Sequence, residues 1–414
     1  MTRLKLFGSI RRKNKTANST PKALRIATPV LSVLLALEFI YLIFTYSTIP
    51  FIANLRHMAI ETSLSTMRHQ WVAYALFPDD IANGVKQTVE EARESQMGIG
   101  STWEEPPASI QDHLNATSRQ EFFELFYELD EISVSEYLNK HPSALQNGWD
   151  NLYINESALD QEGTSMQTIF GDSVLAIDAK NAVLLIRVSD MGYRGVLAIA
   201  KDPSRLSIKP AQRIGFDGQL VGQIAEANNG LLAMTASGFE DMDARGIEGK
   251  STGGVVAGMA RCNGETYGKP MGYGFKRVEL RQDDLLYIVD SQDPISDDCT
   301  DAAEFTPALI IDGEVIVDEN CGWNAINPRA CIGQNDRGEI MMLCVEGRQL
   351  TSLGIGVVGC AEILSRYGCQ QAMNLDGGTS AILWFDGQCV TRCSNEELPE
   401  GRTLPNAFVY ERTN

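Results

Sequence analysis

The sequence predicts an α+β protein: a β-rich mixed sheet domain with few helices, preceded by a transmembrane helix and a helical stalk or accessory region. Three observations predict it. A long apolar run lies near the N-terminus, helical spacing of apolar residues follows, and beyond Gly163 short β-like runs alternate with glycines. The predicted divisions are a basic tail (1–25), a membrane anchor (26–52), the helical region (53–164) and the β-rich domain (165–414).

Charge is distributed unevenly along the chain. Eight basic residues precede the first acidic residue, Glu38, whereas the rest of the chain carries 27 basic and 54 acidic residues. A surface this acidic argues against nucleic-acid binding, because a basic footprint supplies most of the affinity in such complexes. We therefore expect no nucleic-acid partner.

The apolar run at 26–52 is long enough to cross a hydrocarbon core of about 30 Å as a helix. No Ala-x-Ala cleavage pattern closes it, so an uncleaved signal-anchor is favoured over a signal peptide. The basic flank is expected to stay in the cytoplasm. The sequence thus predicts a single-pass protein of the cell membrane, with a cytoplasmic N-terminus and an extracytoplasmic C-terminal domain.

The region that follows the anchor has the spacing of helices. Apolar residues recur at three- and four-residue intervals in 121–138, which predicts one amphipathic helix there. Its apolar stripe consists of Phe122, Phe126, Leu129 and Ile132. We interpret this stripe as packing surface.

The β-rich domain is predicted from short runs of β-branched and apolar residues bounded by turns such as Asp312-Gly313 and Asp386-Gly387. Only the segments 220–228 and 358–366 have clear helical spacing. The candidate strands are 174–177, 182–188, 195–200, 285–289, 308–311 and 340–345.

The distribution of histidine limits the chemistry of this domain. The four histidines lie at 57, 69, 113 and 141, all before the β-rich domain. A Ser-His-Asp triad, a Cys-His pair and a histidine zinc site are therefore excluded within that domain. Catalysis there would depend on carboxylates and arginines.

Nine cysteines lie between 262 and 393, and none forms a Cys-x-x-Cys pattern. This argues against a structural zinc site, and no metal or cofactor is indicated. Outside the membrane disulfides are permitted, but an odd number leaves at least one cysteine unpaired in a monomer. Pairing of Cys389 with Cys393 and of Cys299 with Cys321 is plausible, and the connectivity stays open.

A glycine pattern at 354–359 matches the dinucleotide-binding fingerprint and opens a helix. The preceding strand is predicted to end near Val345, however, so 347–353 intervene where that fold needs a tight turn. We therefore interpret these glycines as points of close backbone approach.

The segment 371–380 concentrates polar chemistry. An apolar strand leads into Asn374 and Asp376, which would point to the same side of an extended segment. A glycine pair then brings backbone N–H groups close, and two hydroxyl residues follow. This combination suits the hydroxyls of a sugar or an anionic group. The alternative is a structural Asx turn into a strand at 381–385, and spacing alone does not decide between them.

An ordered set of motifs resembles the phosphodiester glycosidase family. The resemblance covers 329–410, with a looser match upstream through 234–239 and 246–258. The motifs are Arg329-Ala330-Cys331-Ile332-Gly333, Asp336-Arg337-Gly338, Val345-Glu346-Gly347-Arg348, Ala372 to Ser380, and Arg402 before Pro405-Asn406-Ala407. The resemblance implies hydrolysis of a bond between a sugar and a phosphodiester. Many bacterial members are associated with exopolysaccharide metabolism.

The bond that this family cuts implies roles for individual residues. Asp376 is the expected catalytic carboxylate at the anomeric carbon, and Glu346 is a reserve acid or base, with Asp241 a weaker one. Bidentate contact with phosphate is expected from Arg329, Arg348 and Arg402. The groups expected to orient the sugar are Asn374, Gly377, Gly378, Thr379 and Ser380.

One departure concerns substrate identity. Many relatives have Asn-Gly-Gly-Phe-Phe where this chain has 235–239, Thr-Ala-Ser-Gly-Phe. If that asparagine contacts substrate, Thr235 or Ser237 must replace it.

The predicted function is a membrane-anchored extracytoplasmic glycosidase that hydrolyses a sugar-phosphodiester bond in an envelope or extracellular glycan. The predicted partners are this carbohydrate and, through one N-terminal helix, the membrane. The alternative is a non-catalytic polysaccharide-binding or assembly factor in envelope biogenesis, which would use aromatic platforms such as Trp323 or Trp384. The identity of the sugar and the stereochemistry of hydrolysis stay open.

Overall fold

The computed structural model describes residues 22–64, 70–104, 106–107, 114, 116–241, 251–319, 321 and 323–413. The chain divides into two compact units, Met1–Arg56 and His57–Asn414. The basic tail to residue 21, His69 and His113 lie outside the described residues.

The first unit contains α1 (Lys22–Tyr46) and the beginning of α2 (Pro50–Leu64). Within α1, Pro29–Tyr46 has a mean hydropathy of 1.9. Among the described residues it is the one helix whose length and composition would allow it to cross a membrane. The Arg56 guanidinium donates a hydrogen bond of 2.9 Å to the Ser47 carbonyl and closes the turn between the two helices.

The helices of the second unit are short and lie mostly before the sheets in sequence. They are α3 (Gln70–Leu76), α4 (Asp79–Ser95), α5 (Arg119–Leu125), α6 (Glu131–Lys140), α7 (Val221–Ala227) and α8 (Val357–Arg366), with 3-10 turns η2 (Pro142–Leu145), η3 (Trp149–Asn151), η4 (Pro203–Arg205) and η5 (Gly378–Ser380). The predictions at 220–228 and 358–366 are confirmed by α7 and α8.

The prediction of one helix over 121–138 is wrong. The chain leaves the helical conformation at Phe126, and Asp130 begins α6 by accepting a hydrogen bond of 2.8 Å from the Ser133 N–H. Between the two helices Leu129 pairs with Thr168 in an isolated β-bridge. A side-chain cap and a distant pairing segment thus replace helical hydrogen bonds, and the predicted stripe residue Ile132 is 70% exposed.

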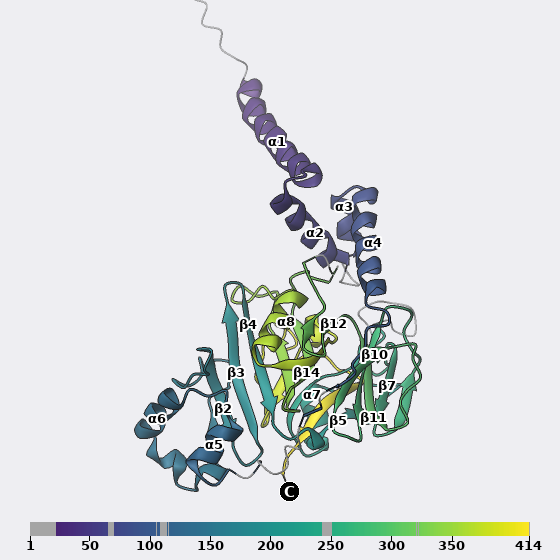
Figure 1. Cartoon of the computed structure of the whole chain (residues 1–414). Helices are drawn as coiled ribbons and strands as arrows, with labels where there is room; N and C mark the ends of the chain where they lie inside the picture. The colour runs from purple at the N-terminus through teal and green to yellow at the C-terminus, as the bar shows by residue number, and fades with distance from the viewer. Residues whose placement is uncertain are drawn as a thin grey trace, which may run out of the picture. The chain divides into compact units, whose positions relative to one another are not determined.

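Nine antiparallel strands form the largest sheet, in the order β1-β2-β3-β4-β15-β14-β16-β12-β13 (Figure 1). The edge strand β1 comes from the region predicted to be a stalk or accessory segment. The strands are β1 (Tyr153–Asn155), β2 (Ser173–Asp178), β3 (Val183–Asp190), β4 (Tyr193–Ala200), β12 (Ala308–Ile311), β13 (Glu314–Val315), β14 (Arg329–Asn335), β15 (Ile340–Val345) and β16 (Cys369–Asn374).

Two five-stranded sheets complete the β-rich part, in the orders β10-β9-β11-β7-β8 and β18-β17-β6-β19-β5. The α+β class with a β-rich core is therefore confirmed. Their strands are β5 (Leu206–Pro210), β6 (Gly230–Thr235), β7 (Met259–Cys262), β8 (Glu265–Gly268), β9 (Lys276–Arg281), β10 (Leu286–Asp290), β11 (Cys299–Phe305), β17 (Leu383–Phe385), β18 (Gln388–Cys389) and β19 (Asn406–Glu411).

Both faces of the nine-stranded sheet are buried. On β15, Leu343 and Val345 belong to the buried cluster that also contains residues of α5, α6 and α8, and Met342 and Cys344 belong to the cluster that contains residues of the two smaller sheets. All nine cysteines lie within the described residues and none forms a disulfide, so neither of the plausible pairs is present.

A buried cation links the α5–α6 segment to the nine-stranded sheet. Lys201 Nζ lies 2.6 Å from Glu128 Oε1 and 3.0 Å from Glu339 Oε1, and the lysine is 0% exposed. Burial raises the pKa of Glu128, while the charge of Lys201 opposes that shift. The lysine therefore compensates two carboxylates that water does not reach.

Replacing Lys201 with methionine is expected to lower the free energy of unfolding by about 3–5 kcal/mol, because two buried carboxylates lose their counter-charge. Urea denaturation measures it. The control is Lys209→Met, which removes the more exposed pair of Lys209 with Glu411 and should cost about 1 kcal/mol or less. Equal losses for the two variants would contradict the role of Lys201.

Candidate active site

Strand register brings the ends of three strands to one edge of the nine-stranded sheet. β14 pairs with β15 through Arg329 and Val345, and with β16 through Cys331 and Asn374. Because both pairings are antiparallel, 346–348 and 375–380 leave the sheet on either side of the start of β14. The structure thus brings together the segments that carry most of the predicted site residues.

The turn after β16 requires both of its glycines. A Cβ on Gly377 would lie 2.6 Å from the Pro328 carbonyl oxygen, and Gly378 has a φ of +60°. The Gly378 N–H donates a hydrogen bond of 3.0 Å to the same carbonyl, which fixes the turn against the start of β14. The backbone then enters η5, whose last residue is Ser380.

Asp376 lies at this turn, where its surroundings shift its pKa in opposite directions. Burial raises the pKa of Asp376 to about 6, and the nearby charge of Asp241 adds to that shift. A hydrogen bond from Ser380, the charge of Arg402 and the Gly377 N–H act in the opposite direction. The carboxyl group therefore changes its protonation state close to neutral pH.

Arg402 is held in place by two neighbours. Its Nη2 lies 2.6 Å from Asp241 Oδ1, and its guanidinium carbon lies 3.9 Å from the centre of the Phe239 ring. Asp241, predicted as a weak reserve acid, thus anchors an arginine. The two carboxylates differ in environment, since Asp241 has an ion-pair partner and Asp376 accepts hydrogen bonds from neutral groups.

Arg348 presents a guanidinium group next to the glycine turn. Its nitrogens would lie 3.5 Å from a Cβ on Gly378, and its Nη2 donates a hydrogen bond of 3.1 Å to Asn327 Oδ1. Burial and then the positive charge of Arg329 lower the pKa of Arg348. Among the described residues no carboxylate pairs with this arginine, so it has N–H groups to offer an anion.

Arg329 and Glu346 lie at the same sheet edge, but both side chains already form hydrogen bonds with backbone groups of the protein. Arg329 is buried, and its Nη2 donates to the carbonyls of Trp323 at 2.8 Å and Ala325 at 2.7 Å. Glu346 is 3% exposed, and its Oε1 accepts a hydrogen bond of 3.0 Å from the Arg392 N–H. In this arrangement Arg329 contributes charge and Glu346 braces a loop.

The predicted amide and hydroxyl ligands divide into two groups. Asn374 is fully buried, and its Nδ2 donates to the Thr306 carbonyl at 2.7 Å, so it does not share an open face with Asp376. Thr235 and Ser237 are fully buried as well, and Ser237 bonds with Asn406 at 3.0 Å. Both side chains are therefore enclosed at the end of β6, and the expectation that one of them replaces the asparagine of the relatives stays a prediction. Thr379, in contrast, is partly exposed.

Sequence reasoning missed Phe239 as the ring beneath Arg402 and Asn327 as the partner of Arg348. No spacing rule connects these pairs, because each joins segments from different strands. The looser family match at 246–258 lies partly outside the described residues, since 242–250 are not described.

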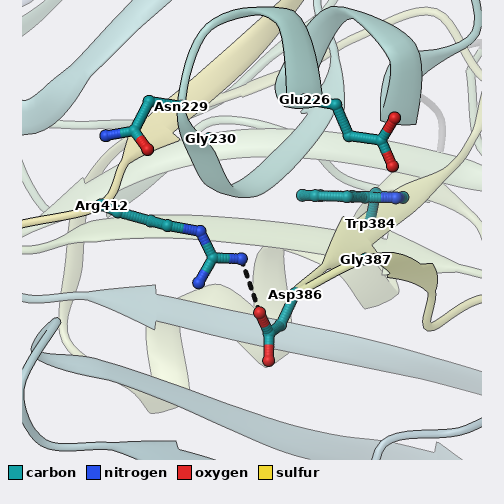
Figure 2. A pocket seen from close by; sticks show the side chains of 7 residues that line it. All are labelled: Glu226, Asn229, Gly230, Trp384, Asp386, Gly387 and Arg412. Carbon is teal, nitrogen blue, oxygen red and sulfur yellow. Dashed lines mark hydrogen bonds and ion pairs between the residues drawn. The ribbon is translucent and has the colours of Figure 1, made fainter.

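A pocket of about 330 Å³ lies elsewhere, at the end of the smaller sheet where β6 begins (Figure 2). Arg412 points toward Asp386 across it, with Nη2 and Oδ1 2.5 Å apart. Trp384, predicted as an aromatic platform, lines the pocket but is only 4% exposed, so it offers little ring surface to a sugar. Its other lining residues are Glu226, Asn229, Gly230 and Gly387. Asp241 follows the opposite end of β6, so this pocket is separate from Asp376.

Comparison with known proteins identifies the C-terminal part of the chain. Residues 224–411 match the family model described as phosphodiester glycosidase, which confirms the resemblance noted in the sequence. An uncharacterized SPbeta prophage-derived protein, YomE of Bacillus subtilis (strain 168), is 29% identical over 188 residues. That alignment covers 43% of this chain and 28% of the relative, so the chain spans under a third of the relative's length.

Similar solved structures include the catalytic domain of zebrafish N-acetylglucosamine-1-phosphodiester alpha-N-acetylglucosaminidase, auto-inhibited by its pro-peptide. It is 18% identical with a TM-score of 0.46, and the match covers 56% of this chain and 82% of that domain. A Burkholderia pseudomallei K96243 protein described as exported is 13% identical with a TM-score of 0.42, covering 53% and 74% of the two chains.

The raised pKa of Asp376 has a consequence for stability. Its ordinary value of 3.8 rises to about 6 on folding, so the folded state holds the proton more tightly between these values. Stability then falls as pH rises from about 4 to about 6, and the full cost persists above that range. Asp376→Asn should therefore stabilise the protein at pH 7.5, by up to about 3 kcal/mol, and should have little effect near pH 4.

Thermal unfolding at several pH values measures this effect, and Asp312 gives a control of opposite sign. Although burial opposes it, hydrogen bonds from Gln371, Thr102 and Trp103 lower the pKa of Asp312. Asp312→Asn should thus destabilise at neutral pH and lose that effect as the pH falls below the ordinary range of aspartate. A destabilised Asp376→Asn at pH 7.5 would overturn the first expectation.

Proposed function

We propose, from the phosphodiester glycosidase domain that residues 224–411 form, that the protein hydrolyses the bond between a sugar's anomeric carbon and a phosphodiester oxygen. The observation that carries the proposal is Asp376, a carboxyl group with a pKa of about 6 beside the ion pair of Arg402 and Asp241. A carboxylate and guanidinium groups are what this reaction needs, and histidine is absent from residues 165–414.

The reaction breaks the anomeric carbon–oxygen bond, and the electron pair leaves with the phosphate. Positive charge develops on the sugar, and a water oxygen finally bonds to the anomeric carbon while its proton passes to a base. A phosphate is a good leaving group and needs little protonation. Asp376, ionised above pH 6, can stabilise the sugar cation, attack it or accept the proton of water.

The departing phosphate needs positive charge. Arg348 has N–H groups without a carboxylate partner among the described residues, and it lies over the Gly378 turn. Arg402 adds a second guanidinium whose direction Asp241 and Phe239 fix. Planar guanidinium groups bind two phosphate oxygens at once, which suits both arginines to this role.

Sugar hydroxyls would meet the groups of the turn itself. The hydroxyl of Thr379 lies 3.3 Å from Ser394 Oγ, and Ser380 donates to Asp376. In this proposal the backbone of Gly377 and Gly378 leaves room for a ring to approach. The buried amide of Asn374 supports the end of β16 and acts on the sugar only through the turn.

The helix α1 would anchor the protein in the cell membrane, with the hydrolase outside. The positively charged start of the chain supports a cytoplasmic N-terminus. A glycan of the envelope or of an extracellular polymer is the substrate that this placement favours.

The central experiment incubates the full-length protein in detergent with a panel of sugar phosphodiesters and measures released sugar. Asp376→Asn should lose at least about 10²-fold in kcat and remain folded. Saturable binding of the glycan without sugar release by the native protein would refute the enzyme and favour a binding or assembly factor.

The pH dependence gives a second expected outcome. Because Asp376 acts as a carboxylate, kcat/KM should rise with pH through an apparent pKa of about 6. Arg402 lowers that pKa, so Arg402→Gln should move the rising limb to higher pH in addition to slowing the reaction. If the rising part of the kcat/KM pH profile does not move in Arg402→Gln, the group that titrates there is not Asp376.

Arg348→Lys should lower kcat/KM by about 10-fold or more, because an ammonium group cannot make the bidentate contact. Arg337→Lys is the matched control, since Arg337 lies in the turn between β14 and β15 at the opposite end of these strands. Steady-state kinetics on one phosphodiester compares them. Equal losses in both variants would argue against phosphate contact by Arg348.

A further inference from the structure

Three arginines and one glutamate form a second charged group at the same edge of the nine-stranded sheet. Arg187 lies near the end of β3, Arg194 near the start of β4, and Glu346 directly after β15. Arg392, in the loop after β18, donates its backbone N–H to Glu346 Oε1 at 3.0 Å, and its guanidinium Nη2 donates to the Leu159 carbonyl at 2.6 Å. We refer to Arg187, Arg194, Arg392 and Glu346 as the arginine cluster.

Strand pairing places these side chains on one face. Arg187 is opposite Val196, which packs toward the smaller sheets, and Arg194 is two residues before Val196 on the same strand. The Glu346 N–H donates to the Arg194 carbonyl at 2.9 Å, so the glutamate continues the row beside Arg194. Alternation along the strands therefore directs Arg187, Arg194 and Glu346 to the same side.

The cluster contains buried polar atoms that lack partners. Arg187 is 7% exposed, and within the described part of the chain its Nε and Nη2 contact no acceptor. Its Nη1 reaches the Gly195 carbonyl only at 3.5 Å. The Nε of Arg194 and the Oε2 of Glu346 likewise find no partner among the residues that the structure describes. Leaving such groups unpaired is costly, so the arrangement calls for a ligand.

The charges in the cluster do not balance. The charges of Arg194, Arg392 and the buried Glu346 act on Arg187, and the further carboxylate of Glu162, 3.7 Å from Arg194, is 91% exposed. The guanidinium groups of Arg194 and Arg392 donate to the backbone carbonyls of Gln161 and Leu159, which carry no net charge. Burial and the charge of Arg194 lower the pKa of Arg187 to about 10, which still leaves it positively charged at neutral pH. An anion would compensate this charge where the protein does not.

The unpaired atoms also select among anions. The arginine N–H groups require acceptors, whereas Glu346 Oε2 requires a donor. Inorganic phosphate has both at neutral pH, because its free oxygens accept and its P–OH donates, whereas a phosphomonoester keeps its P–OH only below its second pKa of about 6. Sulfate and a phosphodiester are fully ionised at neutral pH and have no proton to offer Glu346. We infer that the arginine cluster is a binding site for a phosphate that retains a proton, either inorganic phosphate or a phosphomonoester.

The cluster is connected to the candidate active site through one loop. Cys393, next to Arg392, donates from Sγ to the Thr379 carbonyl at 3.6 Å, and its own carbonyl accepts from Gln349 at 2.8 Å. A phosphate that bonds with Glu346 would thus brace, through the Arg392 backbone N–H that Glu346 accepts, the loop that contacts both Thr379 and the Arg348 segment. The phosphomonoester source rests on the proposed function, because that hydrolysis leaves a phosphomonoester.

Isothermal titration of the full-length protein in detergent at pH 5.5, where both inorganic phosphate and a phosphomonoester carry a P–OH, tests the site with inorganic phosphate, glycerol phosphate, sulfate and dimethyl phosphate as ligands. Phosphate should bind at least about 10-fold more tightly than sulfate or the diester. Tighter binding of glycerol phosphate than of inorganic phosphate would identify a monoester as the natural ligand, and the reverse would identify free phosphate. No phosphate binding, or equal affinity for sulfate, would overturn the inference.

Two variants and a control assign the binding to these residues. Arg187→Gln should weaken phosphate binding by about 10-fold or more. Glu346→Gln, which keeps the shape and can donate, should abolish the preference for phosphate over sulfate. Arg412→Gln alters an arginine already paired with Asp386 and should change neither affinity. If Arg187→Gln fails to fold, the selectivity of Glu346→Gln still decides.

Failure of this inference can be separated from failure of the proposed function. Phosphate binding should persist in Asp376→Asn, because no contact with Asp376 is part of the cluster. If the native protein binds phosphate but releases no sugar, the phosphate site is supported and the proposed hydrolase is refuted. If it releases sugar but binds no phosphate, the hydrolase is supported and the phosphate site is refuted. Unchanged selectivity in Glu346→Gln would show that the glutamate does not contact the ligand.

Discussion

The antiparallel pairing of β14 with both β15 and β16 is the constraint on which the rest of the site depends. These strands lie in the middle of the nine-stranded sheet, and both sheet faces are buried. A slip of one residue would turn every side chain to the other face, so the register is strongly fixed. The Gly378 N–H bond to the Pro328 carbonyl then extends this register into the turn that carries Asp376.

Given that framework, the chemistry is set by how one cation is shared between two carboxylates. Arg402 pairs directly with Asp241 and interacts only at longer range with Asp376. Asp241 thereby anchors the arginine, while Asp376 has mainly neutral hydrogen-bond donors around it and a raised pKa. Two similar side chains thus acquire different tasks from their surroundings.

Much of this architecture could be predicted from local patterns. The strands 308–311 and 340–345, the helices α7 and α8, and the turn at Asp312-Gly313 each follow from short-range periodicity and turn residues. The break between α5 and α6 could not, because Asp130 competes with a helix only when Thr168 arrives from elsewhere in the chain. Likewise, residue type indicated Asp376 and Arg402, but only tertiary structure pairs Arg402 with Asp241.

The arginines at this sheet edge differ in how many of their donors the protein satisfies, and that difference determines what each can bind. Arg329 donates its hydrogen bonds to backbone carbonyls and therefore stabilises the fold. Arg348 keeps donors beside the turn. Arg187 keeps buried donors without partners among the described residues, and Glu346, whose charge acts on Arg187, keeps an unpaired carboxylate oxygen. An anion that approaches Arg348 meets a guanidinium group that forms no ion pair with the described carboxylates, whereas an anion bound at Arg187 would also have to satisfy the unpaired oxygen of Glu346. In the two proposals, the Arg348 position would therefore take a phosphodiester and the Arg187 position a protonated phosphate, because the groups beside the two arginines differ.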